Sequence, residues 1–354
     1  MLRSRLPLLL LALPLFACGR RDVAITAEPA PAVTTVTEER AVNQQGGPVS
    51  PDQGLPRATN GVLPAGAADK VLPVGGKPIV KLIEPGAEPR TDLSYALVKG
   101  TAAKMLMTMD MTMAMKTQGQ SLPTTTIPRM SMGMDAAATD KNPAGDHRIE
   151  SHLNTVSVDA NGGQQEQMAK ALRPQLDAMK GLSMVYWVNP KGHVHDVKLS
   201  LPPGLPPAAQ QLLNGMSQSF ESMVTPLPAE PVGVGAKWQV ISRTATGGAD
   251  LLQSAIYTLK SRDGARATLE VRLIQLAASD TIHTAQMPAG MSAKVKGFNS
   301  SGGGTTQVDL KSVAPEGGTM ALKVTMDIGV QGGGATANDD STVETTTTVN
   351  ISRP

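Results

Sequence analysis

The amino-acid sequence predicts a mainly β (α+β) fold: a large antiparallel sheet, strongly curved or shaped as a half-barrel, with two helices covering its concave face. Three observations lead to this prediction. Segments in which apolar and polar residues alternate recur along the chain, separated by Gly, Pro and Asn. Only two segments have the three- and four-residue apolar spacing of a helix. Strands and helices do not alternate as they would around a parallel sheet.

Residues 1–17 have the parts of a signal peptide. Arg3 and Arg5 form a basic start, and the apolar run from Leu6 to Phe16 is shorter than the roughly 20 residues that span a bilayer. The sequence "LFAC", ending at Cys18, resembles the lipobox of bacterial lipoproteins. That resemblance implies cleavage before Cys18, lipid attachment to it and a membrane as partner. The alternative is a plain secretory signal that ends at an unmodified cysteine.

Composition limits what the rest of the chain can be. Cys18 is the only cysteine, which excludes an intramolecular disulfide and a zinc–thiolate cluster. Residues 18–76 are predicted to be the lipidated cysteine and a disordered tether rich in Pro, Gly and Ala, because this composition buries too little apolar area to fold. The folded domain is placed at 77–354. Its evenly mixed charges and few aromatic residues argue against a nucleic-acid partner.

The expected elements of this domain follow from the apolar periodicity. Strands are predicted at 79–83, 93–99, 103–117, 124–136, 148–159, 237–246, 251–262, 265–277, 293–298, 307–313, 319–330 and 342–351. A helical insertion at about 164–224 is predicted to contain a helix over 164–180, a hairpin over 183–201 and a second helix that Pro226 ends. Pro174 lies inside the first helix and should kink or split it.

The stretch "KMLMTMDMTMAMK", residues 104–116, has methionine at every second position. Side chains alternate between the faces of a strand, so all six methionines should share one face. We expect that face to point inward, against Leu172, Leu176, Leu213, Met216 or Phe220 of the covering helices. The opposite face carries Asp110, whose burial without a partner would be costly.

The next strand carries Met130, Met132 and Met134, and a hairpin that places Met111 opposite Met130 would join both sets into one patch. The candidate ligand-binding residues are Met107, Met109, Met111, Met113, Met130 and Met132. Three interpretations remain open. The methionines form a close-packed core, line an adaptable cavity for a lipid or another hydrophobic molecule, or bind Cu(I) through their thioethers. Against the third, i and i+2 side chains start about 7 Å apart, so six along one strand cannot converge on one ion.

Other candidates for chemistry are thin. His193 and His195 are expected to share a strand face with Val197 and Leu199, but two imidazoles without a third ligand do not make a zinc site. Residues 338–340 form an acidic turn without enough spaced oxygen ligands for calcium. No hydrolase elbow, metalloprotease helix, phosphate loop or dinucleotide fingerprint is present. We therefore predict no catalytic residue, no metal, no cofactor and no enzymatic activity.

Three features together carry a resemblance that covers most of the chain after the tether. They are the lipobox with its tether, the strand of alternating methionines, and "PLPAEPVGVGAKW" from Pro226 to Trp238. They resemble a family of uncharacterised bacterial lipoproteins known only as a domain of unknown function, and the expected architecture is similar to periplasmic lipoprotein and lipid carriers. The resemblance implies an exported lipoprotein anchored to the cell envelope, on its periplasmic side or at the cell surface. A tethered carrier for a hydrophobic ligand and a structural lipoprotein without a ligand both remain open.

Overall fold

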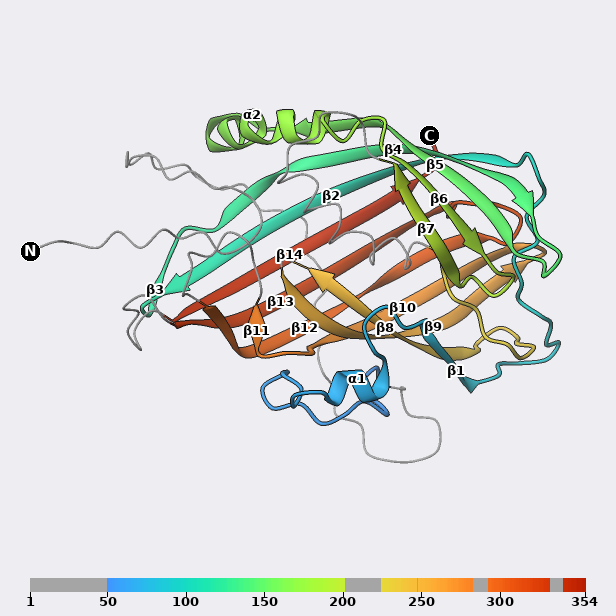
Figure 1. Cartoon of the computed structure of the whole chain (residues 1–354), viewed down its shortest axis with the longest axis horizontal. Helices are drawn as coiled ribbons and strands as arrows, with labels where there is room; N and C mark the ends of the chain where they lie inside the picture. Colours follow the sequence, from blue (N-terminus) through green and yellow to red (C-terminus); the bar gives the residue numbers. More distant parts are fainter. Residues whose placement is uncertain (1–49, 201–223, 247, 283–291, 332–339) are drawn as a thin grey trace, which may run out of the picture.

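The computed structural model describes residues 50–200, 224–246, 248–282, 292–331 and 340–354, and across them the fold is mainly β (Figure 1). The signal peptide, Cys18 and the second helix of the predicted insertion lie outside the described residues. The strands are β1 (Ile79–Glu84), β2 (Ala102–Thr117), β3 (Gln120–Ser121), β4 (Thr125–Lys141), β5 (His147–Asp159), β6 (Ser183–Val188), β7 (Val194–Ser200), β8 (Lys237–Thr246), β9 (Ala249–Asp263), β10 (Arg266–Ala277), β11 (Thr281–Ile282), β12 (Ser292–Asp309), β13 (Gly317–Gln331) and β14 (Ser341–Ser352). The described helices are α1 (Ala67–Val71) and α2 (Gly163–Asp177).

All these strands belong to one 14-stranded antiparallel sheet that does not close. Its order is β1-β8-β9-β10-β12-β13-β14-β2-β4-β5-β6-β7, with β11 beside β12 and β3 beside β2. Two long meanders are thus joined where the last strand, β14, pairs with β2. The predicted antiparallel sheet is confirmed, and the predicted hairpin over 183–201 is the β6–β7 pair.

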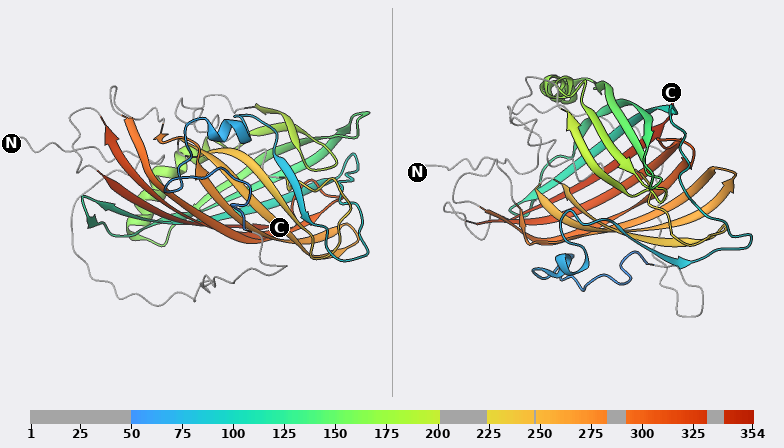
Figure 2. Two further views of the ribbon diagram at one scale, coloured as in Figure 1. Left: turned by 90° about the horizontal axis from the view of Figure 1, so that it is seen from below. Right: turned by 45° about the vertical axis from the view of Figure 1, so that its right-hand side comes forward.

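The sheet is strongly curved (Figure 2). One core cluster brings Ile149 and Tyr186, from β5 and β6, together with Trp238 and Leu269, from β8 and β10. Trp238 stacks on Tyr257 with ring centroids 5.7 Å apart. Two distant parts of the sheet therefore share one core, and the face that carries these residues is the concave face.

The strands predicted at 293–298 and 307–313 are joined through residues 299–306 into one strand, β12, which ends at Asp309, so the break predicted between them is wrong. The glycines allow the backbones of neighbouring strands to approach each other closely. A Cβ on Gly304 would lie 1.9 Å from the carbonyl oxygen of Thr319, and one on Gly302 would lie 2.7 Å from that of Ala321. Glycine is needed where backbones approach so closely, so a glycine run does not always mark a turn.

The strand predicted at 93–99 is also absent from the sheet. This segment is extended and its alternate residues Leu93, Tyr95 and Leu97 are buried, which explains the period of two. Its backbone bonds go elsewhere: Tyr95 N–H donates to Pro190 O, and Ala96 N–H donates to Leu310 O, both at 2.8 Å. A core-crossing segment satisfied by loop carbonyls has the same sequence pattern as a strand.

The domain begins earlier than the predicted residue 77. Within 50–76, the side chains of Leu63, Ala68 and Leu72 are buried against Ile241 and Leu252 on the convex face. Residues 50–76 are therefore packed on the sheet, and the tether boundary predicted at residue 76 is wrong for them. The short helix α1 in this segment was not predicted, and it covers the face opposite to the methionines.

Helix α2 confirms the first predicted helix, although it ends at Asp177. It continues through Pro174 for three residues and is not split there. Its contacts are with β4 and β5, at one end of the concave face. Among the described residues, no helix is long and apolar enough to cross a bilayer.

Candidate functional site

The six methionines of β2 share the concave face, as predicted. The β2–β14 ladder is regular, with Met109 opposite Val349 and Met113 opposite Thr345. Met105 is buried, whereas the other five methionines of the strand are half-buried. We call the six candidate residues Met107, Met109, Met111, Met113, Met130 and Met132 the methionine surface.

Strand β4 extends this surface in a register different from the predicted one. Met109 lies opposite Met130, and Met107 lies opposite Met132, two residues away from the predicted pairing. The ladder is interrupted after Met109 by a bulge in β4 that contains Pro128. Proline cannot donate a ladder hydrogen bond and is typical of such bulges. The continuous methionine patch is confirmed, but its register could not be predicted.

Helix α2 covers one end of the methionine surface. Its Leu172 is buried in a cluster with Met130 and Val158, and Met109 and Leu176 pack at the edge of that cluster. Met132 packs in the neighbouring cluster with Met179, just after the helix. The predicted packing against the first helix is present for Met109, which packs against the cluster that contains Leu172, as Leu176 does. The predicted contacts with Leu213, Met216 and Phe220 lie outside the described residues.

The concave face is uncharged and mostly apolar across the middle of the sheet. Its residues form four rows that run across the strands. They are Trp238–Tyr257–Val271–Gly304–Met320–Val349–Met109–Met130, Val240–Ala255–Leu273–Gly302–Leu322–Thr347–Met111–Ile127, Ser242–Gln253–Gln275–Ser300–Val324–Thr345–Met113–Thr125, in which a side-chain hydrogen bond joins Gln275 to Ser300, and Thr244–Leu251–Ala277 followed by Phe298–Met326–Val343–Met115, where the backbone of residues 60–61 bonds to both Ala277 and Phe298. None of these side chains is charged at neutral pH, and burial raises the pKa of Tyr257 to about 12.

Charged groups occupy the convex face instead. Asp110 of β2 accepts two hydrogen bonds from Arg129, at 2.8 Å from Nε and 3.0 Å from Nη2. This contact raises the pKa of Arg129. On the same face Arg243 binds Asp250, and Lys260 binds Glu270. The two faces of the sheet are therefore strongly different in polarity.

One of the four rows is polar at its β8–β12 end. Ser300 Oγ donates to Gln275 Oε1, and Gln275 Nε2 donates to Gln253 Oε1, both at 3.0 Å. Gln275 and Ser300 are only 8% and 5% exposed, whereas Gln253 is half-buried. A directed chain of hydrogen bonds thus runs from the buried core to Gln253.

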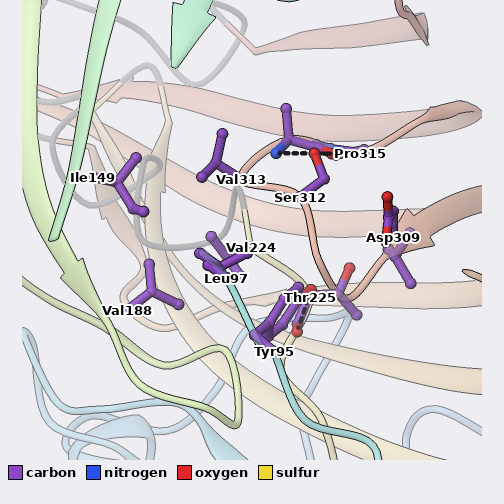
Figure 3. A pocket seen from close by; sticks show the side chains of 12 residues that line it. Tyr95, Leu97, Ile149, Val188, Val224, Thr225, Asp309, Ser312, Val313 and Pro315 are labelled. Atoms are coloured by element: carbon purple, nitrogen blue, oxygen red, sulfur yellow. Dashed lines mark hydrogen bonds between the residues drawn. The ribbon is translucent and has the colours of Figure 1, made fainter. Parts of the chain in front are cut away.

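The core around Tyr95 and Ile149, on the concave side of the sheet, is tightly filled. A cavity of about 20 Å³ remains there, lined among others by Tyr95, Leu97, Ile149 and Val188 (Figure 3). That volume holds about one water molecule. The Tyr95 hydroxyl donates to Thr225 O at 3.3 Å, and burial raises the pKa of Tyr95. The described residues around this cavity leave room there for no ligand larger than a water molecule.

A larger hollow lies where residues 60–61 cross β10 and β12. Its volume is about 470 Å³, and its lining includes Leu276, Asn299 and Thr325 at convex positions together with Gln275, Phe298 and Ser300 of the concave rows. The hollow therefore reaches the polar row where β10 and β12 part, and its lining contains none of the six residues of the methionine surface.

Of the two histidines singled out by their spacing, His193 precedes β7, and His195 does not share a face with Leu199. Leu199 pairs with Met184 on the concave face, whereas His195 pairs with Trp187 on the convex face. A bulge at Asp196, whose φ is +53°, reverses the alternation between them. Instead, Nδ1 of His195 lies 2.9 Å from Oδ2 of Asp196, and its Nε2 lies 3.4 Å from Oδ2 of Asp146. Among the described residues, no group of three His, Cys, Asp or Glu side chains is arranged to hold a metal ion.

No protein-family model and no curated protein matches the chain. Among solved structures, the outer membrane protease OmpT from Escherichia coli is 9% identical with a TM-score of 0.17, over 71% of this chain and 93% of that chain. OccK11 (OpdR) from Pseudomonas aeruginosa is 8% identical with a TM-score of 0.17, over 72% of this chain and 97% of that chain. At such TM-scores neither likeness supports an argument about function.

Proposed function

We propose that this protein is an exported lipoprotein, anchored to the cell envelope through Cys18, that binds a hydrophobic ligand on its concave face without enzymatic activity. The anchor is inferred from the basic start, the short apolar run and the single cysteine. Attachment of more than one acyl chain would give stable anchoring. The periplasmic side of the envelope and the cell surface are both compatible with this proposal.

The observation that carries the binding proposal is that five of the six residues of the methionine surface are half-buried, all except Met130. A close-packed core would bury these side chains, yet Met107, Met109, Met111 and Met113 each keep part of their surface accessible. Methionine is flexible and polarizable, so such a surface can repack around acyl chains of different length. The uncharged rows around it suit an apolar occupant.

The alternative is a structural envelope lipoprotein without a small-molecule ligand. The small cavity near Tyr95 and Ile149 favours this alternative, because the described side chains around it fill that part of the interior. The two proposals therefore differ in what lies on the methionine surface. Binding of Cu(I) is a remote third possibility that rests on the thioethers alone.

Native mass spectrometry of the protein purified from its own envelope tests the proposal. We expect additional mass from a hydrophobic molecule that organic solvent removes. A variant with Met111→Asp should lose this mass, and the matched convex variant Thr112→Asp should keep it. A clean apo mass for the wild-type protein would contradict ligand binding and favour the structural alternative.

A further inference from the structure

We infer that the concave face selects a ligand whose polar group is uncharged and accepts hydrogen bonds, such as the ester of an acylglycerol, and that Gln253 donates to it. This inference rests on the proposed function, because it names the ligand class of the same surface. Its starting point is the polar row of Gln253, Gln275 and Ser300, which lies among apolar rows on the concave face.

The direction of the hydrogen bonds decides what Gln253 offers. Ser300 donates to the oxygen of Gln275, and the nitrogen of Gln275 donates to the oxygen of Gln253. The Gln253 oxygen thereby accepts a hydrogen bond within the row, and its amide presents Nε2, which has only hydrogens to donate. The hydrogen-bond chain thus fixes the amide orientation, with Gln275 and Ser300 as positioning residues. A carbonyl oxygen complements this donor, whereas a second donor does not.

The charge distribution decides between a neutral ester and an ionised carboxylate. The rows on both sides of Gln253 run through Ala255 and Leu251, and none of their described members is charged. A carboxylate placed there would lose its hydration without gaining a cationic partner, which costs far more than a neutral carbonyl does. A free fatty acid is therefore disfavoured relative to its ester.

The distance from the donor to the methionines fits an acyl chain. Gln253 and Met113 belong to the same row and are separated by five strand spacings. At about 4.8 Å per spacing this is roughly 24 Å along the sheet, comparable to a long acyl chain. One ligand can thus place its ester at Gln253 and its chain end on the methionine surface.

The experiment compares three ligands of one chain length on the full-length protein by titration calorimetry at pH 8: monoolein, its ether analogue without the carbonyl, and oleate. We expect monoolein to bind roughly threefold to tenfold more tightly than the ether, the usual contribution of one hydrogen bond. Oleate should bind at least about tenfold more weakly than monoolein. If none of the three binds, the proposed function fails. If all three bind equally, only this inference fails.

Single substitutions test which residue causes the preference for the ester. Gln253→Leu should bind the ether as the wild-type protein does but lose the preference for the ester, and ether binding shows that the variant is folded. Ser300→Ala, a smaller change at the far end of the hydrogen-bond chain, should weaken the preference partly. Gln307→Leu on β12, whose side chain is exposed, is the matched control and should retain it. A Gln253→Leu protein that still prefers the ester would overturn the assignment of the donor.

Discussion

Asp110 shows how one residue fixes which face of a strand is buried. It stands between Met109 and Met111, and its carboxylate reaches Arg129 on the convex face. The alternation of β2 then forces the methionines to the concave side. This part of the candidate site could be predicted from the sequence, because the cost of burying a lone carboxylate is independent of the fold.

The face assignment predicts unequal effects of the same substitution at two positions of β2. Met109→Asp places a carboxylate in the cluster with Leu172 and Leu176, whereas Thr112→Asp places it on the exposed convex side. We expect Met109→Asp to lower the free energy of unfolding by about 3 kcal/mol or more. Thr112→Asp should change it by less than about 1 kcal/mol. Urea titration measures both, and equal values would refute the face assignment.

The buried side chain of His147 leads to a prediction of how the free energy of unfolding depends on pH. It is 1% exposed, and burial, followed by the charge of Lys141, lowers its pKa below the ordinary value of 6.5, with Asp146 opposing the shift. Above pH 6.5 the imidazole is neutral in both states and has no effect. Below that pH the unfolded chain gains a proton that the folded protein resists, so stability falls as pH decreases. His193, whose pKa burial also lowers, acts in the same direction.

We therefore expect the free energy of unfolding to fall between pH 7 and pH 5, and His147→Leu to flatten part of that fall. His152→Gln, at an exposed position, is the control and should leave the slope unchanged. The carboxylates of Asp92, Glu270 and Asp280 have lowered pKa values, so their contribution is lost only below about pH 4.5. A slope between pH 7 and 5 that His147→Leu leaves intact would show that this histidine is not responsible.

At the scale of single elements, the sequence predicts most strands because period-two alternation survives wherever one face is buried. β8 has the predicted bounds, β2 and β5 differ from theirs by one residue at one end, and β14 differs by one residue at each end. The failures have physical causes that a single sequence does not reveal. Close packing uses the same glycines in β12 that a turn uses, and a bulge in β7 reverses the face of His195.

Gly304 of β12 and Gly317 of β13 give a matched pair of substitutions. In Gly304→Ala the new Cβ would meet the Thr319 carbonyl at 1.9 Å, and backbone atoms must move to admit it. In Gly317→Ala on β13 the nearest atom is an ordinary 3.4 Å away. We expect Gly304→Ala to cost about 2–3 kcal/mol of unfolding free energy and Gly317→Ala to cost less than about 1 kcal/mol. Similar thermal midpoints for the two variants would argue against close packing as the role of the β12 glycines.

Arg243 holds α1 to the sheet. Its side chain is 5% exposed, binds Asp250 at 2.6 and 2.7 Å, donates to Leu72 O at 3.0 Å and lies 3.2 Å from Asp69. Arg243→Ala would leave Asp250 without its partner, and because that carboxylate is about one-third exposed we expect a loss of about 2–3 kcal/mol. Arg272→Ala, an exposed change on the same face, should cost little. Chemical denaturation of both variants measures the difference, and comparable losses would contradict this role of Arg243.

For the whole molecule, the candidate site depends on the curvature of the sheet, which a prediction of the individual strands does not include. The sequence predicts a sheet and a methionine stripe, but the shared core of Ile149, Tyr186, Trp238 and Leu269 forms only when the two ends of the sheet approach each other. That closure depends on packing between residues far apart in the sequence. The polar row of Gln253, Gln275 and Ser300 was missed for the same reason, because its members come from three strands. Alternating polar residues in apolar strands are the only signal of it in the sequence.

The start of the folded domain gives a prediction for the whole chain. Composition predicts a flexible tether up to residue 76, whereas the structure packs residues 55–72 on the convex face. Leu63 N–H donates to Ala277 O at 2.9 Å, and Leu72 N–H donates to Ala68 O at 2.8 Å. This segment must unfold locally before trypsin can cut within it. In brief digestion of the full-length protein, we therefore expect cleavage after Arg40 well before cleavage after Lys70.

The Arg243→Ala variant tests whether Arg243 holds α1 on the sheet. If α1 is held by that guanidinium, the variant should be cut after Lys70 much faster than the wild-type protein, while cleavage after Arg40 keeps its rate. Mass spectrometry of the fragments distinguishes the two sites. Equal cleavage after Arg40 and Lys70 in the wild-type protein would return the boundary to residue 76, because a packed segment resists a protease that a tether admits.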